Sequence, residues 1–208
     1  MKKLAGFIVI MLVIVIAVCT YRKKDTFEQQ KGIAQQLIRF HVRANSDTDS
    51  DQKLKLMVKD SVITYLEPKL SQSGSIDETR QILNNNMDVI HNLAVETLVA
   101  NGSDYSVKVY FEESYFPIKT YGDITLPPGD YEAFRIDIGE SEGKNWWCVL
   151  YPPLCFVDAT HGSLPDSSKE KLKNILTDDE YKTITTTTST TSTEFRFKYL
   201  TFLNGIFN

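Results

Sequence analysis

The feature that most constrains this chain is an uninterrupted apolar run close to its first residue. Residues 4–18 contain nothing more polar than Gly6, and basic residues flank the run on both sides. As a helix with about 1.5 Å rise per residue, the run spans roughly 25 Å, slightly less than the ~30 Å hydrocarbon core of a bilayer. No face of it is polar, which argues against a helix of a soluble domain. We therefore expect residues 1–24 to be a signal peptide or a short membrane anchor.

Whether this segment is removed stays open on sequence grounds. Ala17 and Cys19 stand at the two positions before a cut that favour small residues, so cleavage after Cys19 is one outcome. Val18 is a poor residue to precede a lipid-modified cysteine. Retention as an anchor is the alternative, and in either case the rest of the chain is expected outside the cytoplasm.

The charge distribution argues against a nucleic-acid partner. Residues 1–24 hold five of the 23 basic residues and none of the 27 acidic residues, so the exported part is strongly acidic. Such a surface is repelled by phosphate backbones. The chain also lacks the GxGxxG, GxxxxGK, HExxH and GxSxG patterns of nucleotide binding, zinc proteolysis and serine hydrolysis. We predict no enzymatic activity and no cofactor.

Two cysteines, Cys148 and Cys155, lie in the part expected outside the cytoplasm, where disulfides persist. Two prolines stand between them, so the chain can double back and bring the sulfur atoms together. A disulfide and two buried free thiols are both consistent with this spacing. A zinc site would need two more ligands, and Asp158 and His161 form an irregular set, so no metal site is expected.

The remaining residues alternate between helical and extended patterns. Residues 25–36 are polar and read as a tether. In residues 38–44 apolar and basic residues alternate, which predicts a strand with one buried and one exposed face. Helices are expected over about 51–66 and 75–100. Strands are expected near 105–112, 118–126, 131–138 and 146–151, the last of them central in the sheet because it is apolar on both faces.

This order predicts an α+β fold, a mostly antiparallel sheet with two long helices packed on it and an N-terminal hydrophobic export segment before it. A further helix is expected over 163–176. The Ser/Thr tract within residues 183–193 reads as a linker rather than a strand. We expect one domain over residues 37–182 and an apolar tail over 194–208.

The most conspicuous polar group is His41, which Arg39 and Arg43 flank on the same strand face. Two neighbouring cations lower the pKa of a histidine and keep it neutral near pH 7. The stripe is either the solvent-exposed face of a strand or a basic surface that docks an acidic or carbonyl-rich partner. His91, on a helix, reads as a solvated residue.

Two other features have a structural and a functional interpretation. The acid-rich residues 45–51 favour helix capping over calcium, because a calcium loop starting at Asp47 would lack its glycine and its bidentate glutamate. Trp146 and Trp147 are adjacent and point to opposite faces of a strand. One of them can fill the core, while the other is either covered by a second layer or exposed as a binding hot spot.

Five stretches of the chain closely resemble the stage II sporulation protein R family: residues 38–47, 51–55, 119–123, 129–139 and 145–158. The resemblance implies a signalling protein that is made in the forespore of an endospore-forming bacterium and exported into the space between the two septal membranes. There it would activate a membrane-embedded aspartic protease of the mother cell, which removes the pro-sequence of the mother-cell sigma factor.

The matched motifs supply the residues that we expect to contact this partner. They are the polar and aromatic residues Arg39, His41, Arg43, Asn45, Asp47, Tyr121, Asp123 and Trp147. Replacing Arg39 and His41 by alanine is expected to abolish activation and to leave folding intact. Two other functions remain open, a cell-envelope hydrolase using His41 with Asp47 or Asp123, and a membrane-tethered structural protein of the septum.

Overall fold

The computed structural model describes residues 2–155 and 164–186. Its elements, in chain order, are α1 (Lys2–Gln35), β1 (Ile38–Arg43), α2 (Asp49–Leu70), α3 (Ile76–Asn85), α4 (Met87–Ala100), β2 (Val107–Phe116), β3 (Lys119–Tyr121), β4 (Ile124–Leu126), β5 (Gly129–Ile138), β6 (Asn145–Tyr151), α5 (Asp166–Ile175) and α6 (Asp178–Thr186). The α+β class is thus confirmed.

The main sheet has four strands in the order β2-β5-β1-β6. β2 and β6 are antiparallel to their neighbours, but β1 and β5 run parallel, so the mostly antiparallel sheet is mixed. The prediction that residues 146–151 form a central strand is wrong, because in the described part of the chain β6 lies at an edge. Its apolar character reflects layers packed on both faces of the sheet rather than a central position.

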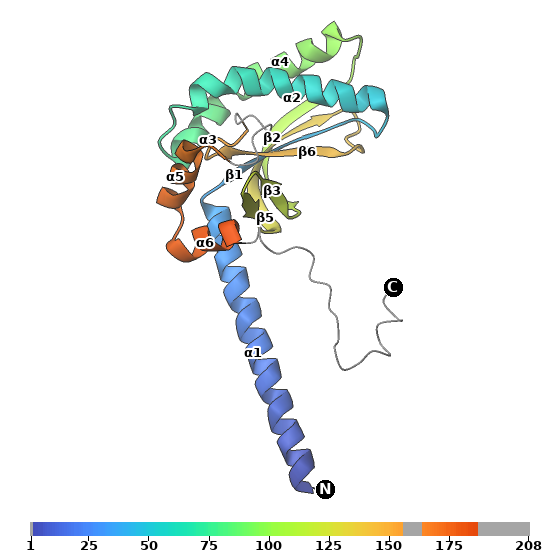
Figure 1. The fold of residues 1–208 in the computed structure, drawn as a ribbon. Helices are drawn as coiled ribbons and strands as arrows, with labels where there is room; N and C mark the ends of the chain where they lie inside the picture. Colours follow the sequence, from blue (N-terminus) through green and yellow to red (C-terminus); the bar gives the residue numbers. More distant parts are fainter. Residues whose placement is uncertain (1, 156–163, 187–208) are drawn as a thin grey trace.

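Helices α2, α3 and α4 cover one face of the sheet (Figure 1). The second long helix of the prediction is divided at Asn86, where the backbone leaves helical geometry. Asn86 Nδ2 donates a hydrogen bond to the carbonyl of Ile82 (2.7 Å), and its Oδ1 accepts one from the Tyr65 hydroxyl (2.6 Å). These bonds favour the break because an asparagine side chain competes with the backbone of a helix.

The prediction that β1 exposes its basic face to solvent is wrong. Arg39 and His41 are 0% and 1% exposed. β1 pairs on both of its edges, and a second layer packs against this face. Its buried apolar residues come from the end of α1, β2, the β3–β4 hairpin and the C-terminal helices, and include Ile33, Leu37, Phe116, Ile124, Leu126, Leu164, Leu172 and Ile184.

α1 continues through residues 25–35, which were expected to be a polar tether. Ile33 is fully buried, and Gln30 Nε2 donates a hydrogen bond to the carbonyl of Asp130 (3.3 Å), so the end of this helix is part of the domain. Among the described residues, no helix combines the length and the apolar character that crossing a membrane requires.

The C-terminal half of the second layer contains α5, which lies within the predicted 163–176, and α6, which was not predicted. Thr177 and Glu180 form a capping box at the start of α6, since Thr177 Oγ1 accepts from the Glu180 N–H and Glu180 Oε2 accepts from the Thr177 N–H. Residues 183–186, expected in the linker, are helical. The rest of the Ser/Thr tract and the tail 194–208 lie outside the described residues.

Candidate functional site

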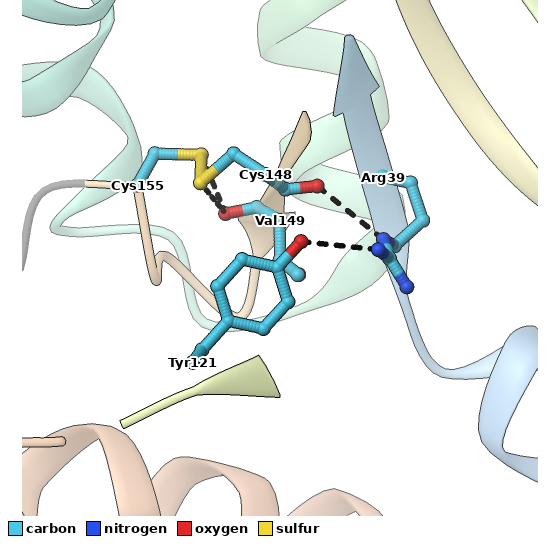
Figure 2. The surroundings of a disulfide bond; sticks show 5 residues. All are labelled: Arg39, Tyr121, Cys148, Val149 and Cys155. Carbon is cyan, nitrogen blue, oxygen red and sulfur yellow. Dashed lines mark hydrogen bonds between the residues drawn. A yellow bond between two sulfur atoms is a disulfide. The ribbon is translucent and has the colours of Figure 1, made fainter. Parts of the chain in front are cut away.

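A disulfide joins Cys148 and Cys155, whose Cα atoms are 5.6 Å apart. The carbonyl of Val149 accepts hydrogen bonds from the N–H groups of Leu154 (3.1 Å) and Cys155 (3.3 Å). The chain therefore folds back directly after β6, as Figure 2 shows for the two cysteines and Val149. Asp158 and His161 lie outside the described residues, and no metal-binding cluster occurs among the residues that are described.

The Arg39 guanidinium is enclosed by aromatic rings instead of carboxylates. Its Cζ lies 4.4 Å from the ring centroid of Phe116, 4.9 Å from that of Tyr131 and 5.7 Å from that of Tyr121. Arg39 Nε donates to the carbonyl of Cys148 (3.3 Å), and Nη2 donates to the Tyr121 hydroxyl (3.1 Å; Figure 2). Burial lowers the pKa of Arg39. Arg39 thus links β1, β6 and the β3–β4 hairpin from inside the domain.

His41 lies next to this cluster on the same face of β1. Its ring stacks on Trp147 with 5.0 Å between centroids and 6° between planes, and it is 5.4 Å from the Phe116 ring. Burial, with a smaller contribution from Arg135, lowers the pKa of His41 to about 4. The imidazole is therefore neutral at physiological pH. Its Nε2 lies 3.5 Å from Glu112 Oε1, and the side chain of Asn145 also interacts with the ring.

The strand register places His41 in the second of two parallel rows that cross all four strands on this face. The first row is Lys108, Asp137, Arg43 and Asn145, and the second is Tyr110, Arg135, His41 and Trp147. We call these eight residues the polar sheet face. Residues directly opposite each other on paired strands have side chains on the same face, so the two rows lie side by side. His41 and Asp137 are buried and Lys108 is exposed, while the other five side chains are half-buried.

Ion pairs and hydrogen bonds hold β2 and β5 together on the polar sheet face. Arg135 donates from Nε to Asp137 and from Nη1 to Glu112, both at 2.7 Å. The Tyr110 hydroxyl donates to Asp137 Oδ2 (2.8 Å). Burial and this bond raise the pKa of Tyr110 to about 12. Burial alone would raise the pKa of Glu112, but the bonds from Arg135 outweigh it and lower that pKa.

Asn45 and Asp47 lie in the loop after β1 and bind the connection between β5 and β6. Asn45 Oδ1 accepts from the Glu140 N–H (2.9 Å), and Asp47 Oδ1 accepts from the Lys144 N–H (2.7 Å). Thr48 caps α2 by accepting a hydrogen bond from the Asp51 N–H. The helix-capping interpretation of residues 45–51 is therefore confirmed.

Tyr121 and Asp123 belong to the β3–β4 hairpin. Tyr121 contacts Arg39, as described above, whereas Asp123 accepts from the Leu164 N–H (3.0 Å) and pairs with Lys169 Nζ (2.6 Å). Asp47 and Asp123 therefore bind groups other than His41, and the contacts do not support a catalytic histidine–aspartate pair. Of the expected partner residues, the structure brings His41, Arg43 and Trp147 together on the polar sheet face. The buried Arg39 and the half-buried Tyr121 lie beside them.

A groove of about 610 Å³ lies at the other end of β2 and β5, against α1 and α3. Phe27 and Phe111 line it together with four acidic residues, Glu112, Glu113, Asp130 and Glu132, and two basic residues, Lys31 and Arg80. Arg80 is paired with Glu132. Acidic residues thus outnumber basic residues in this groove, and Glu112 borders the polar sheet face, where it pairs with Arg135.

Comparison with known proteins assigns the chain to a family. The family model described as Stage II sporulation protein R (spore_II_R) matches residues 34–161. The chain belongs to the stage II sporulation protein R family. It is 36% identical over 166 residues to the Stage II sporulation protein R of Bacillus subtilis (strain 168), an alignment that covers 75% of this chain and 74% of that protein. No solved structure matches the chain.

The stage II sporulation protein R match runs from the end of α1 through β6, so it contains every residue of the polar sheet face. It also contains Arg39 and the three aromatic residues around its guanidinium, Phe116, Tyr121 and Tyr131. Helices α5 and α6 lie beyond it. A role in sporulation follows from membership of this family.

Sequence reasoning missed five members of the polar sheet face: Lys108, Tyr110, Arg135, Asp137 and Asn145. The alternation of apolar and polar residues within each strand places each of them on one face of its own strand. Joining them to His41 requires the strand order, which the pattern of a single strand does not contain.

Proposed function

We propose that this chain is an intercompartmental signal of endospore formation. It is exported from the forespore into the space between the two septal membranes. There it activates a membrane-embedded aspartic protease of the mother cell, which then processes the precursor of the mother-cell sigma factor. The observation that carries this proposal is membership of the stage II sporulation protein R family.

Two features of the chain support export. The apolar run of residues 4–18 fits a signal peptide or an anchor. The Cys148–Cys155 disulfide suits a compartment where thiols are not kept reduced. Mass analysis of the mature protein distinguishes the two outcomes, since cleavage after Cys19 removes residues 1–19 and an anchor keeps them.

The proposed activation requires no covalent bond of this chain to form or break. Arg39, Asn45, Asp47 and Asp123 are occupied by contacts within the domain, which suits a scaffold that presents a surface. A protein that binds the competent state of a protease ~100-fold more tightly than the idle state shifts that equilibrium by about 2.7 kcal/mol. A preference of this size would raise a protease that is about 1% competent to about half competent, and a complete switch would require about 10⁴-fold.

Co-expression in a host that does not sporulate tests this function. The chain, the protease and the sigma-factor precursor are produced together, and each is omitted in turn. We expect cleavage of the precursor only when all three are present. Equal cleavage without this chain would make it a bystander, and cleavage without the protease would make it an enzyme.

A further inference from the structure

We propose that the polar sheet face is the docking surface for the protease, and that it binds an acidic segment of that partner. This inference rests on the proposed function and adds where the contact lies and which chemistry recognises it. It leaves Asn45, Asp47 and Asp123 out of the contact with the protease, because these three side chains are bonded within the domain.

Charge is the first argument. The exported part of the chain is acidic, yet the polar sheet face contains three basic residues and one acidic residue. Arg135 already binds both Asp137 and the neighbouring Glu112. In the described part of the chain, Arg43 and Lys108 have no carboxylate within ion-pair distance, and Arg43 donates only to the carbonyl of Gly143 (3.2 Å). These two cations remain available to carboxylates of a partner.

Lys119 extends the positive charge over Trp147. Its Nζ lies 5.8 Å from the ring centroid, and no carboxylate within the described ranges pairs with it. Lys119 comes from β3, so the hairpin adds a third available cation at the β6 side of the face. A carboxylate that approaches Trp147 therefore meets the positive charge of Lys119.

The second argument is the kind of side chain present. Tyr110 and Trp147 stand at the two ends of the second row, and both are half-buried. Tyrosine, tryptophan and arginine are the residues most enriched among binding hot spots, because rigid amphipathic rings lose little entropy on binding. Between these two rings lie the buried His41 and the charged Arg135.

Other parts of the surface fit an acidic partner less well. The opposite face of the sheet is covered by α2, α3 and α4 (Figure 1). The groove beside α1 has acidic residues in its lining, and Glu113 and Asp130 there are exposed. An acidic segment is repelled at that groove and attracted to the polar sheet face.

Binding of the full chain to the purified protease in detergent micelles tests the inference. The variants are Lys108→Glu, and Lys108→Glu combined with Arg43→Glu. The matched control is Lys53→Glu with Lys173→Glu, two exposed lysines on α2 and α5. Lys108 is exposed, so its replacement leaves the fold intact and separates docking from folding. Thermal unfolding of each variant checks this.

We expect the double variant on the face to bind about tenfold more weakly, Lys108→Glu to bind measurably more weakly, and the control to stay within about twofold of the parent. Affinity of the parent is expected to fall as salt is raised. Unchanged binding of both face variants, or equal weakening of the control, overturns the inference. If the parent activates the protease but the face variants bind as tightly as the parent, only the proposed docking surface is wrong. If the parent neither binds nor activates, the proposed function fails as well.

Discussion

The two faces of the sheet are built by different rules. The face under α2, α3 and α4 is apolar, and Phe40, Val42, Phe134, Ile136 and Cys148 fill it. The other face contains Arg39, His41, Arg135 and Asp137, all with little exposure. Alternation along a strand identifies the first face correctly. It wrongly assigns the second face to solvent, because aromatic rings and ion pairs from neighbouring strands can bury polar side chains completely.

The largest expected effects come from a pair of adjacent residues, one on each face. Phe40→Ala and Arg39→Ala should each lower the free energy of unfolding by about 3 kcal/mol or more, the first through a cavity and the second through loss of the packed guanidinium. Arg39→Met should cost less than about 1.5 kcal/mol, since an apolar chain of similar size avoids burying a charge. Denaturant unfolding followed by tryptophan fluorescence measures all three.

This expectation replaces the one drawn from sequence, in which alanine at positions 39 and 41 leaves the fold intact. Both residues are buried, so loss of activation in that double variant would report loss of structure. A cost below about 1 kcal/mol for Arg39→Ala would contradict the enclosed position of this residue.

The pH dependence of stability follows from His41. The unfolded chain binds a proton near the ordinary pKa of 6.5, while the folded chain binds it only near pH 4. Between these values the unfolded state holds more protons, so stability falls as pH falls from about 6.5 to 4. The full difference amounts to about 3 kcal/mol.

His41→Gln should remove this part of the pH dependence and leave the part that comes from carboxylates. Arg135, Glu112 and Asp137 act on the same imidazole, so the comparison is made between the parent and the variant at each pH. Parallel stability curves for the two proteins would show that His41 titrates normally in the folded state.

A smaller effect is expected from the disulfide. Cys148 and Cys155 close a short loop, and the loss of chain entropy for such a loop corresponds to about 2.5 kcal/mol. Replacing both by serine should lower the midpoint of thermal unfolding and should make the protein insensitive to reductant. The parent in reductant should approach the variant, and a parent that does not respond would show that the bridge contributes nothing.

The sequence predicted local features well and relations between strands poorly. It located β1, α2, β5 and α5, because their residues show clear periodicity and because α2 also begins at the capping residue Thr48. It missed α6 although the T-x-x-E capping signal of residues 177–180 is present, since the threonines that follow have low helix propensity.

The candidate site shows the same limit. His41, Arg43 and Trp147 were selected from their motifs, but Tyr110 and Arg135 were not. The parallel pairing of β1 with β5 brings Arg135 beside His41, although 93 residues separate them in the chain. Neither the parallel pair nor the edge position of β6 can be read from the pattern of one strand, because both depend on how several elements pack together.

The adjacent residues Trp146 and Trp147 give the most direct test of the difference between the faces. Trp146 packs on Phe40 on the helix side, and Trp147 stacks on His41 on the polar sheet face. The measurement is the rate of precursor processing by each alanine variant, at a temperature where both are folded. We predict that Trp147→Ala loses most of its activation and that Trp146→Ala keeps it. Equal rates for the two variants, or the reverse order, would contradict the account.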